Sequence, residues 1–352
     1  MSRVLIISDI HFGIPQKLND ILWAMKTARA YAAKNNIEKV FVLGDVFHDR
    51  VTYNIEVMNV AYEFFDETKQ IGQEWIAFPG NHDMPLRNSW EVNALKPLNK
   101  VLTIISDIKL VKVYGQRFWI VPFIHYESVY MKVLEYIEKQ YEDGDVLLTH
   151  VGVNNATLNE CFLIKNWSVV DFTDSKFDIV FTGHFHCHQK VGKNVWYPGS
   201  PIPFRFDEGM VPHGFIDFDT ATKEIEFVEI FDLNLIEGPR PPDYITITDD
   251  MIEEYKCFSG DNVRVQLNRD YSKDEMIRMR DSLKDRGATN IKLNKVVEEH
   301  IDLDDQQKSS ALSLKSPADL FKRWVEHDSP KKLNAELLNK LNDEVISETL
   351  LS

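Results

Sequence analysis

The chain has 352 residues, a hydrophobic fraction of 44% and a formal net charge of −15. This length and composition are those of a globular protein with one large domain plus attachments, and the charge argues against tight nucleic-acid binding by the chain alone. Three cysteines without Cys-x-x-Cys spacing argue against a disulfide framework. No apolar run suits a signal peptide or a membrane span, so we expect a cytoplasmic protein without membrane contacts.

Residues 1–236 alternate strand-like apolar runs with helical patterns, which is typical of an α/β domain. The predicted strands cover 4–7, 40–43, 75–78, 146–148 and 179–181. Between the first two, the segment 18–35 carries apolar residues at helical spacing: Ile21, Leu22, Met25, Ala28 and Ala32.

Each of these five strands is followed by a short polar group. The groups contain, in chain order, Asp9 and His11; Asp45; Asn81, His82 and Asp83; His150; and His184 and His186. Because the carboxyl ends of strands in an α/β sheet share one edge, we expect these side chains to meet there. Imidazole nitrogens mixed with carboxylate oxygens suit a pair of transition-metal ions. Singly, each residue could be a turn, a helix cap or a satisfied histidine, but five of the eleven histidines fall in these groups.

In this order the groups resemble the D-x-H, G-D, G-N-H-D, lone His and G-H-x-H signature of the calcineurin-like metallophosphoesterases. The resemblance implies an α/β fold, a four-layer sandwich of two sheets flanked by helices, holding two divalent metal ions, with Mn(II) expected. It assigns Asp9, His11 and His186 to the first metal, Asn81, His150 and His184 to the second, and Asp45 to both. His82 would act as the acid toward the leaving oxygen, and Asp83 would fix its ring tautomer.

Two longer stretches are similar to SbcD, the nuclease subunit type of the SbcCD complexes that process DNA breaks. They are Gly-Asp-Val-Phe-His at 44–48 and Tyr-Pro-Gly-Ser-Pro-Ile-Pro-Phe-Arg-Phe-Asp-Glu at 197–208. The likeness covers residues 1 to 215. It implies a Mn-dependent exonuclease on duplex ends and endonuclease on single strands or hairpins, acting in DNA recombination, repair or replication. His48 would reach the substrate phosphate; alternatively, it caps the following helix. The compact length suits a bacteriophage version working in its host's cytoplasm.

Beyond this domain, 237–243 contains the turn residues of a linker, and 237–300 is expected to be a DNA-binding cap domain. A strand at 263–267, a helix at 273–286 and a strand at 291–296 are predicted there. From 261 to 297 nine Lys and Arg face six Asp and Glu, a local excess of 9 − 6 = +3. That excess is equally compatible with a solvated helix face, so the assignment rests on position.

The C-terminal part is predicted to be a flexible linker at 301–315 followed by a pair of amphipathic helices at 316–352. The resemblance implies that these helices dock on an SMC-like ABC ATPase of the SbcC type, because the chain has no Walker motif of its own. The alternative is that they pack on the main domain. A homodimer is also implied, through helices near 18–35 and 87–98.

Two rival functions stay open. The first is another dimetal phosphoesterase, either a phosphoprotein phosphatase or a cyclic-nucleotide phosphodiesterase, which would prefer a small aryl phosphate to DNA. The second is a scaffold that keeps the fold without the chemistry. Such a scaffold typically loses metal ligands, and none of the seven expected ligands is missing here.

Overall fold

The computed structural model describes residues 2–52, 54–86, 89–159, 162–163, 170–209, 211–254 and 260–295, without the side chains of 158–159 and 162–163. These residues belong to one compact unit, Met1–Val296. The expected linker at 301–315 and helical pair at 316–352 lie outside the described residues.

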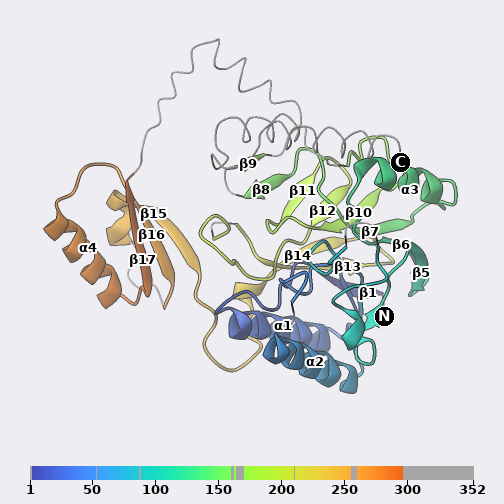
Figure 1. Cartoon of the computed structure of the whole chain (residues 1–352), viewed down its shortest axis with the longest axis horizontal. Coiled ribbons are helices and arrows are strands. Elements are labelled where there is room, and N and C mark those ends of the chain that lie inside the picture. Colours follow the sequence, from blue (N-terminus) through green and yellow to red (C-terminus); the bar gives the residue numbers. More distant parts are fainter. Residues whose placement is uncertain are drawn as a thin grey trace, which may run out of the picture. The chain divides into compact units, whose positions relative to one another are not determined.

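Two six-stranded sheets form the larger part of this unit (Figure 1). The first has the order β14-β13-β1-β2-β3-β4 and the second β11-β12-β10-β7-β6-β5. The strands of the first sheet are β1 (Arg3–Ile7), β2 (Lys39–Val42), β3 (Glu74–Ala77), β4 (Thr103–Ile104), β13 (Gly214–Asp219) and β14 (Ile225–Glu229). Those of the second are β5 (Lys109–Val113), β6 (Gln116–Val121), β7 (Val146–His150), β10 (Ile179–Gly183), β11 (Gln189–Val191) and β12 (Val195–Tyr197). A short hairpin is formed by β8 (Thr157–Asn159) and β9 (Phe162–Leu163).

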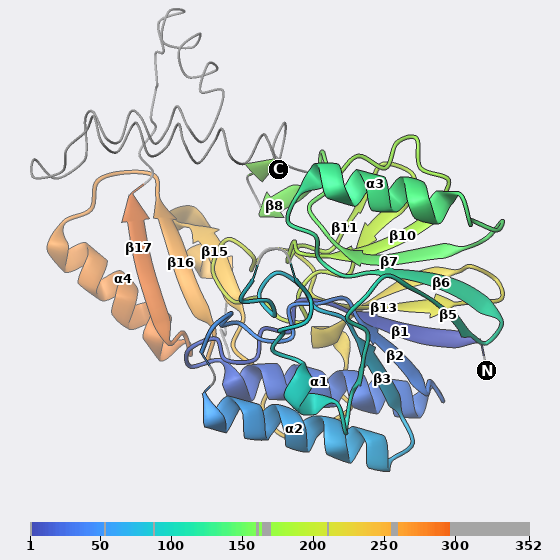
Figure 2. The same ribbon diagram turned by 45° about the vertical axis from the view of Figure 1, so that its right-hand side comes forward.

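Helices cover the outer face of each sheet (Figure 2). Helices α1 (Leu18–Lys34) and α2 (Ile55–Gln70) pack on the first sheet, and α3 (Glu127–Glu138) packs on the second. A third apolar cluster fills the space between the sheets. The order helices, sheet, sheet, helix confirms the expected four-layer α/β sandwich.

Strand β1 shows why the central strands are apolar on both faces. Leu5 and Ile7 pack toward the helices, whereas Val4 and Ile6 pack between the sheets. Successive side chains of a strand point to opposite faces, so a strand in the middle of four layers needs apolar residues at every position. This requirement produces the continuous apolar runs that made the strands predictable.

The prediction of a helix at 87–98 is wrong for residues 89–98, the part of this range that the structure describes. Residues 89–98 contain bends, turns and one short 3-10 helix, η1 (Lys96–Leu98). The side chain of Asn93 donates to the Trp90 carbonyl at 2.7 Å and accepts from the Leu95 N–H at 3.1 Å. These bonds replace helical ones, and Pro97 has no N–H to offer, so a continuous α-helix does not form.

The region expected to be a cap domain forms a small α/β unit, a three-stranded sheet with one α-helix packed on it. Its parallel sheet has the order β15-β16-β17, with β15 (Tyr244–Thr248), β16 (Asn262–Leu267) and β17 (Asn290–Lys295). Helix α4 (Lys273–Asp285) begins with a capping box between Ser272 and Glu275. The 3-10 helices η2 (Ile230–Asp232) and η3 (Asp249–Glu254) precede and follow β15. Strand β15 was not predicted, because its short alternating pattern directly follows the proline-rich stretch.

None of the helices in the described part of the chain combines the length and hydropathy that crossing a bilayer requires.

Candidate metal centre

The loops that leave β1 and β2 stay hydrogen-bonded to each other beyond the ends of the strands. The His11 N–H donates to the Asp45 carbonyl at 3.0 Å, and the Phe12 N–H donates to the Val46 carbonyl at 2.8 Å. This pairing holds Asp9 and His11 beside Asp45. The loop that follows β3 also approaches the loop that follows β2. A Cβ on Gly80 would lie only 2.3 Å from Oδ1 of Asp45. Glycine at this position therefore allows the three loops to meet.

Four of the predicted ligands have a left-handed backbone. The φ angles are 52° at Asp9, 53° at His11, 51° at Asp45 and 102° at His184. Non-glycine residues rarely adopt positive φ, and such strain collects at functional sites, where the surrounding structure imposes it.

Three of the predicted ligands of the first metal gather into one cluster. The ligand atoms of Asp9, His11 and His186 all lie within 4.8 Å of one another. Nε2 of His11 lies 3.1 Å from Nε2 of His186, and Nε2 of His11 lies 3.8 Å from Oδ2 of Asp45. Facing ring nitrogens leave lone pairs that a shared cation would satisfy.

The predicted ligands of the second metal form an adjoining cluster. Oδ1 of Asn81 lies 3.0 Å from Nε2 of His150 and 2.8 Å from Nδ1 of His184. Oδ2 of Asp45 lies 3.4 Å from Nε2 of His150. Asp45 thus touches both clusters, as a bridging ligand must. All seven residues of the predicted set come together, while their individual roles stay predictions.

The far sides of the rings show that the centre is built for cations. Nδ1–H of His150 donates to the Leu43 carbonyl at 2.7 Å, and Nδ1–H of His186 donates to Oε1 of Glu208 at 2.9 Å. Such bonds fix the tautomer and turn the Nε2 lone pair inward. Burial lowers the pKa of His11 well below its usual range, and burial together with the nearby charge of His150 lowers the pKa of His184 to about 3. Both rings are therefore neutral and able to bind metal.

His150 and Asp45 form the charged pair of the centre. Burial opposes charge on His150, but the carboxylate of Asp45 outweighs it and raises the pKa of His150 to about 9. Burial alone would raise the pKa of Asp45, but the nearby His150 outweighs burial and lowers it. A pKa above neutrality means that a metal ion binding to His150 would have to displace a proton.

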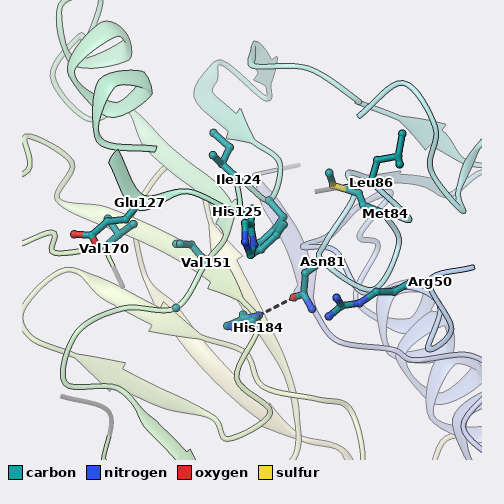
Figure 3. A pocket seen from close by; sticks show the side chains of 12 residues that line it. Arg50, Asn81, Met84, Leu86, Ile124, His125, Glu127, Val151, Val170 and His184 are labelled. Carbon is teal, nitrogen blue, oxygen red and sulfur yellow. Dashed lines mark hydrogen bonds between the residues drawn. The ribbon is translucent and has the colours of Figure 1, made fainter. Parts of the chain in front are cut away.

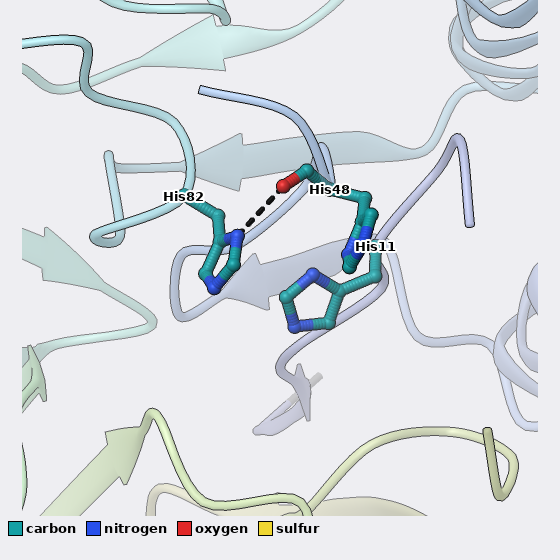
Figure 4. Close-up of side chains that lie close together, drawn as sticks. All are labelled: His11, His48 and His82. Carbon is teal, nitrogen blue, oxygen red and sulfur yellow. Dashed lines mark hydrogen bonds between the residues drawn. The ribbon is translucent and has the colours of Figure 1, made fainter. Parts of the chain in front are cut away.

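Two more histidines lie beside the first cluster (Figure 4). The ligand atoms of His11, His48 and His82 lie within 4.8 Å of one another, and the His48 and His82 rings stack at 5.6 Å and 14°. His48 does not cap the next helix, because the N-cap of α2 is Asn54, whose side chain accepts from the Glu56 N–H. Burial lowers the pKa of His48.

The role expected for Asp83 needs correction. Nδ1–H of His82 donates to the His48 carbonyl at 2.6 Å, so this carbonyl, and not Asp83, sets the ring tautomer. Asp83 instead accepts the backbone N–H groups of Val46, Phe47 and Gly80 at 3.2, 2.9 and 3.0 Å. It therefore clamps the second loop to the third. Burial and the charge of Asp45 raise the pKa of Asp83 to about 7.

The sequence did not single out Glu208 or Phe204. Glu208 is completely buried and accepts a hydrogen bond from the His186 ring. Burial would raise the pKa of Glu208, but the bond to His186 outweighs it and lowers the pKa to about 2. The Phe204 ring meets His11 and His186 edge-on at 5.7 and 5.5 Å. Both residues belong to the stretch 197–208, whose similarity to nucleases was noticed without any role for single residues. Glu208 lies 22 residues after His186, and a separation of this length gives no local sequence signal.

A cavity of about 280 Å³ opens beside Asn81 and His184 (Figure 3). Phe123 lines it, with its ring stacked on His184 at 6.1 Å and 25°. Arg50 stands at the same cavity and forms no ion pair with any described residue. The cavity thus offers an apolar wall and the Arg50 guanidinium next to the second metal position.

The family model of the calcineurin-like phosphoesterases matches residues 2–188, which is more than half of the chain. The chain therefore belongs to the calcineurin-like phosphoesterase family, whose members hydrolyse phosphoester bonds at a centre of two metal ions.

Two viral proteins are among its relatives. The chain is 25% identical over 215 residues to the predicted phosphoesterase 244L of Invertebrate iridescent virus 6, covering 58% of this chain and 72% of the relative. It is 25% identical over 280 residues to the predicted phosphoesterase 078R of Invertebrate iridescent virus 3, covering 75% of each.

Among solved structures, the nuclease MPE of Pseudomonas putida matches with a TM-score of 0.33 and 12% identity, covering 63% of this chain and 87% of that one. A protein of Thermotoga maritima solved by NMR matches with a TM-score of 0.29 and 17% identity, covering 65% of this chain and 98% of that one. Global likenesses this low carry no argument about fold or function.

We expect metal binding to release protons. A metal at His150 must displace the proton that Asp45 stabilises, and the pKa of His150 is about 9. Affinity for Mn(II) should therefore rise about tenfold per pH unit between about pH 6.5 and about 8. Calorimetric titration in two buffers of different ionisation enthalpy counts the protons released. Equal heats in both buffers would contradict the charged His150–Asp45 pair.

Glu208→Gln should weaken Mn(II) binding about 10–100-fold, because the amide can no longer hold the His186 ring as a charged acceptor does. Calorimetric titration of the variant measures this loss. Asp207→Asn is the matched control: it makes the same change one residue earlier, on a side chain that pairs with Arg205 at 3.2 Å. Equal losses in both variants would mean that charge in general, rather than the bond to His186, supports the metal.

Proposed function

We propose that this chain is an SbcD-type DNA nuclease that uses Mn(II) to cut phosphodiester bonds, as an exonuclease on duplex ends and an endonuclease on single strands or hairpins. The observation that carries the proposal is the stacked pair His48 and His82 beside the metal cluster. Neither ring belongs to the seven predicted ligands. Two spare imidazoles at the rim suit a substrate phosphate and a leaving oxygen, both of which need a proton donor.

In the proposed mechanism, seven residues hold the two metal ions and two histidines handle the substrate. Asp9, His11 and His186 would hold one metal, Asn81, His150 and His184 the other, with Asp45 between them. When bound, two such ions polarise a phosphoryl oxygen and make a water a better nucleophile. His82 keeps Nδ1–H on the His48 carbonyl, which leaves Nε2 to deliver a proton to the departing oxygen. His48 donates to a non-bridging phosphate oxygen.

Sequence and surface features support DNA as the substrate. The stretches 44–48 and 197–208 are similar to the SbcD type, and 197–208 supplies Glu208 and Phe204 to the centre. The cavity beside the second metal position pairs the Phe123 ring with the Arg50 guanidinium, which suits a nucleotide's base and phosphate. The phosphatase or cyclic-nucleotide alternative needs no cap domain.

His82→Ala should abolish cleavage of linear duplex DNA in Mn(II) while leaving metal binding intact, since His82 moves a proton and holds no metal. Gel analysis of DNA products and calorimetric metal titration check the two parts. Normal cleavage by the variant would overturn the assignment of the acid. If the unsubstituted chain hydrolyses an aryl phosphate monoester faster than DNA, the rival phosphoesterase function holds instead.

The proposal includes an SMC-like ABC ATPase of the SbcC type as partner, held by the helical pair at 316–352, and a homodimer as the working form. The net charge of −15 supports a partner, because 55 Asp and Glu against 40 Lys and Arg make the chain as a whole repel the DNA backbone.

Truncation after Leu314 should leave metal-dependent DNA cleavage intact and remove association with the ATPase, because the cut leaves the whole described unit in place. Co-expression and affinity purification with an SMC-like ABC ATPase of the SbcC type measure the association. Co-purification of the truncated chain at full stoichiometry would contradict the docking role of 316–352.

A further inference from the structure

A second cavity adjoins the one beside Asn81 and His184. Its volume is about 500 Å³, which is within the usual range of small-molecule sites. Both cavities are lined by Phe123, Ile124 and His125, the segment that follows β6 (Figure 3). Phe123 also stacks on the His184 ring. The second cavity is therefore separated from a predicted metal ligand by a single aromatic side chain.

Hydrogen bonds between loops of the two large sheets fix the walls of this cavity. Trp90 lies in the loop between β3 and β4, and its Nε1–H donates to the Phe123 carbonyl at 2.8 Å. The Phe123 N–H donates to the Pro79 carbonyl at 3.0 Å. Asn93 donates to the Trp90 carbonyl at 2.7 Å and to Oγ of Ser106 at 3.1 Å. The irregular stretch that replaces the expected helix thus supplies one wall of the cavity.

The start of α3 supplies the opposite part of the lining. Tyr126 is the N-cap residue of this helix and is 49% exposed. Val129, almost one turn later, is 44% exposed, and Val133 follows it along the lining. Contiguous apolar surface that stays open to solvent beside a reaction centre is typical of a ligand site.

The residue types of the two cavities suit different parts of a nucleotide. None of the described residues that line the second cavity is Lys or Arg, so a phosphate would find no counter-charge there. The first cavity contains the Arg50 guanidinium. A base is the flat and uncharged part of a nucleotide, and every base has a face that stacks on an aromatic ring. Ser89 and Ser106 add hydroxyl groups to the second cavity, which can bond to the edge of a base.

The connection between base and phosphate fits this division. One sugar joins the two parts of a nucleotide, so a phosphate held at the metal positions places its base in a space that adjoins them. The second cavity is such a space, because it shares the segment 123–125 with the cavity at Asn81 and His184.

We propose that this second cavity, called the base cavity, receives the unpaired base of the nucleotide next to the scissile phosphate, and that Tyr126 determines this specificity by stacking on the base. The proposal rests on the nuclease function proposed above and names the DNA that is cut. A paired base must leave its stack before it can enter a pocket, which is easiest in a single strand or at a frayed end. The chain should therefore prefer such DNA to the interior of a duplex.

The test uses the full chain with Mn(II) and end-labelled single-stranded oligonucleotides in which one nucleotide lacks its base. Moving this abasic nucleotide along the strand shows how kcat/KM for one bond depends on the base at each place. An abasic nucleotide next to the cut bond should lower kcat/KM about 5- to 100-fold, because one base no longer stacks. An abasic nucleotide far from the bond should have little effect.

Tyr126→Ala should lower kcat/KM on the intact strand by the same factor. The loss should fall mainly on KM, since the base is held equally in the ground state and the transition state. On the strand that is abasic next to the cut bond, the variant should cause no further loss, because the base that Tyr126 contacts is already missing. Tyr126→Phe, which keeps the ring, should cut the intact strand as the unsubstituted chain does.

Tyr136→Ala is the matched control. Tyr136 lies on the same helix and is 57% exposed, but it does not line the base cavity. It should leave kcat/KM unchanged on both strands, and an equal loss in this variant would overturn the role of Tyr126. The same conclusion follows if Tyr126→Ala loses as much on the abasic strand as on the intact one.

Two further outcomes separate the possible failures. If sedimentation shows that Tyr126→Ala turns a dimer into a monomer, a second copy of the chain covers the ring, and the base cavity is overturned. Cleavage that is indifferent to the abasic nucleotide at every position overturns the base cavity alone. A chain that cuts no DNA in Mn(II) overturns the nuclease function, and the base cavity with it.

Discussion

The buried carboxylate of Asp45 is the interaction on which the centre depends. Its side chain is 2% exposed, and Oδ1 accepts the His82 N–H at 2.7 Å. Oδ2 lies near the rings of His11 and His150, which come from different sheets. A buried anion is tolerated only with compensating donors or cations. Asp45 therefore draws a loop of the first sheet and a strand end of the second toward one point.

The rest of the sandwich makes this arrangement possible. Positive φ at Asp9, His11, Asp45 and His184 is unfavourable by about 1–2 kcal/mol for each residue. Such strain persists because the strands that carry these turns are packed on both faces. Asp83 adds two backbone hydrogen bonds between the second and third loops, from Val46 and Phe47, and these bonds hold the ligands of the two loops in place.

The segment 204–209 connects this centre to the small sheet β15-β16-β17. Phe204, Phe206 and Glu208 alternate along one stretch, and two of them face the metal ligands while the third faces the small sheet. A fold that hydrolyses phosphoesters thereby has a physical connection between its candidate metal centre and the small sheet, where Phe206 packs against Tyr244, Arg264 and Lys292.

The sequence by itself determined the layered α/β fold and the seven candidate ligands. Apolar runs and strand-end Asp, Asn and His are local patterns, and strand ends of one sheet must share an edge. It misjudged 87–98, where Asn93 bonds to the backbone in place of a helix, and it missed β15. Only the tertiary structure decided that Asp83 clamps loops, that the His48 carbonyl orients His82, and that Glu208 and Phe206 tie the centre to the cap. Such contacts join residues far apart in the chain, and their distances follow from packing, which no local pattern records.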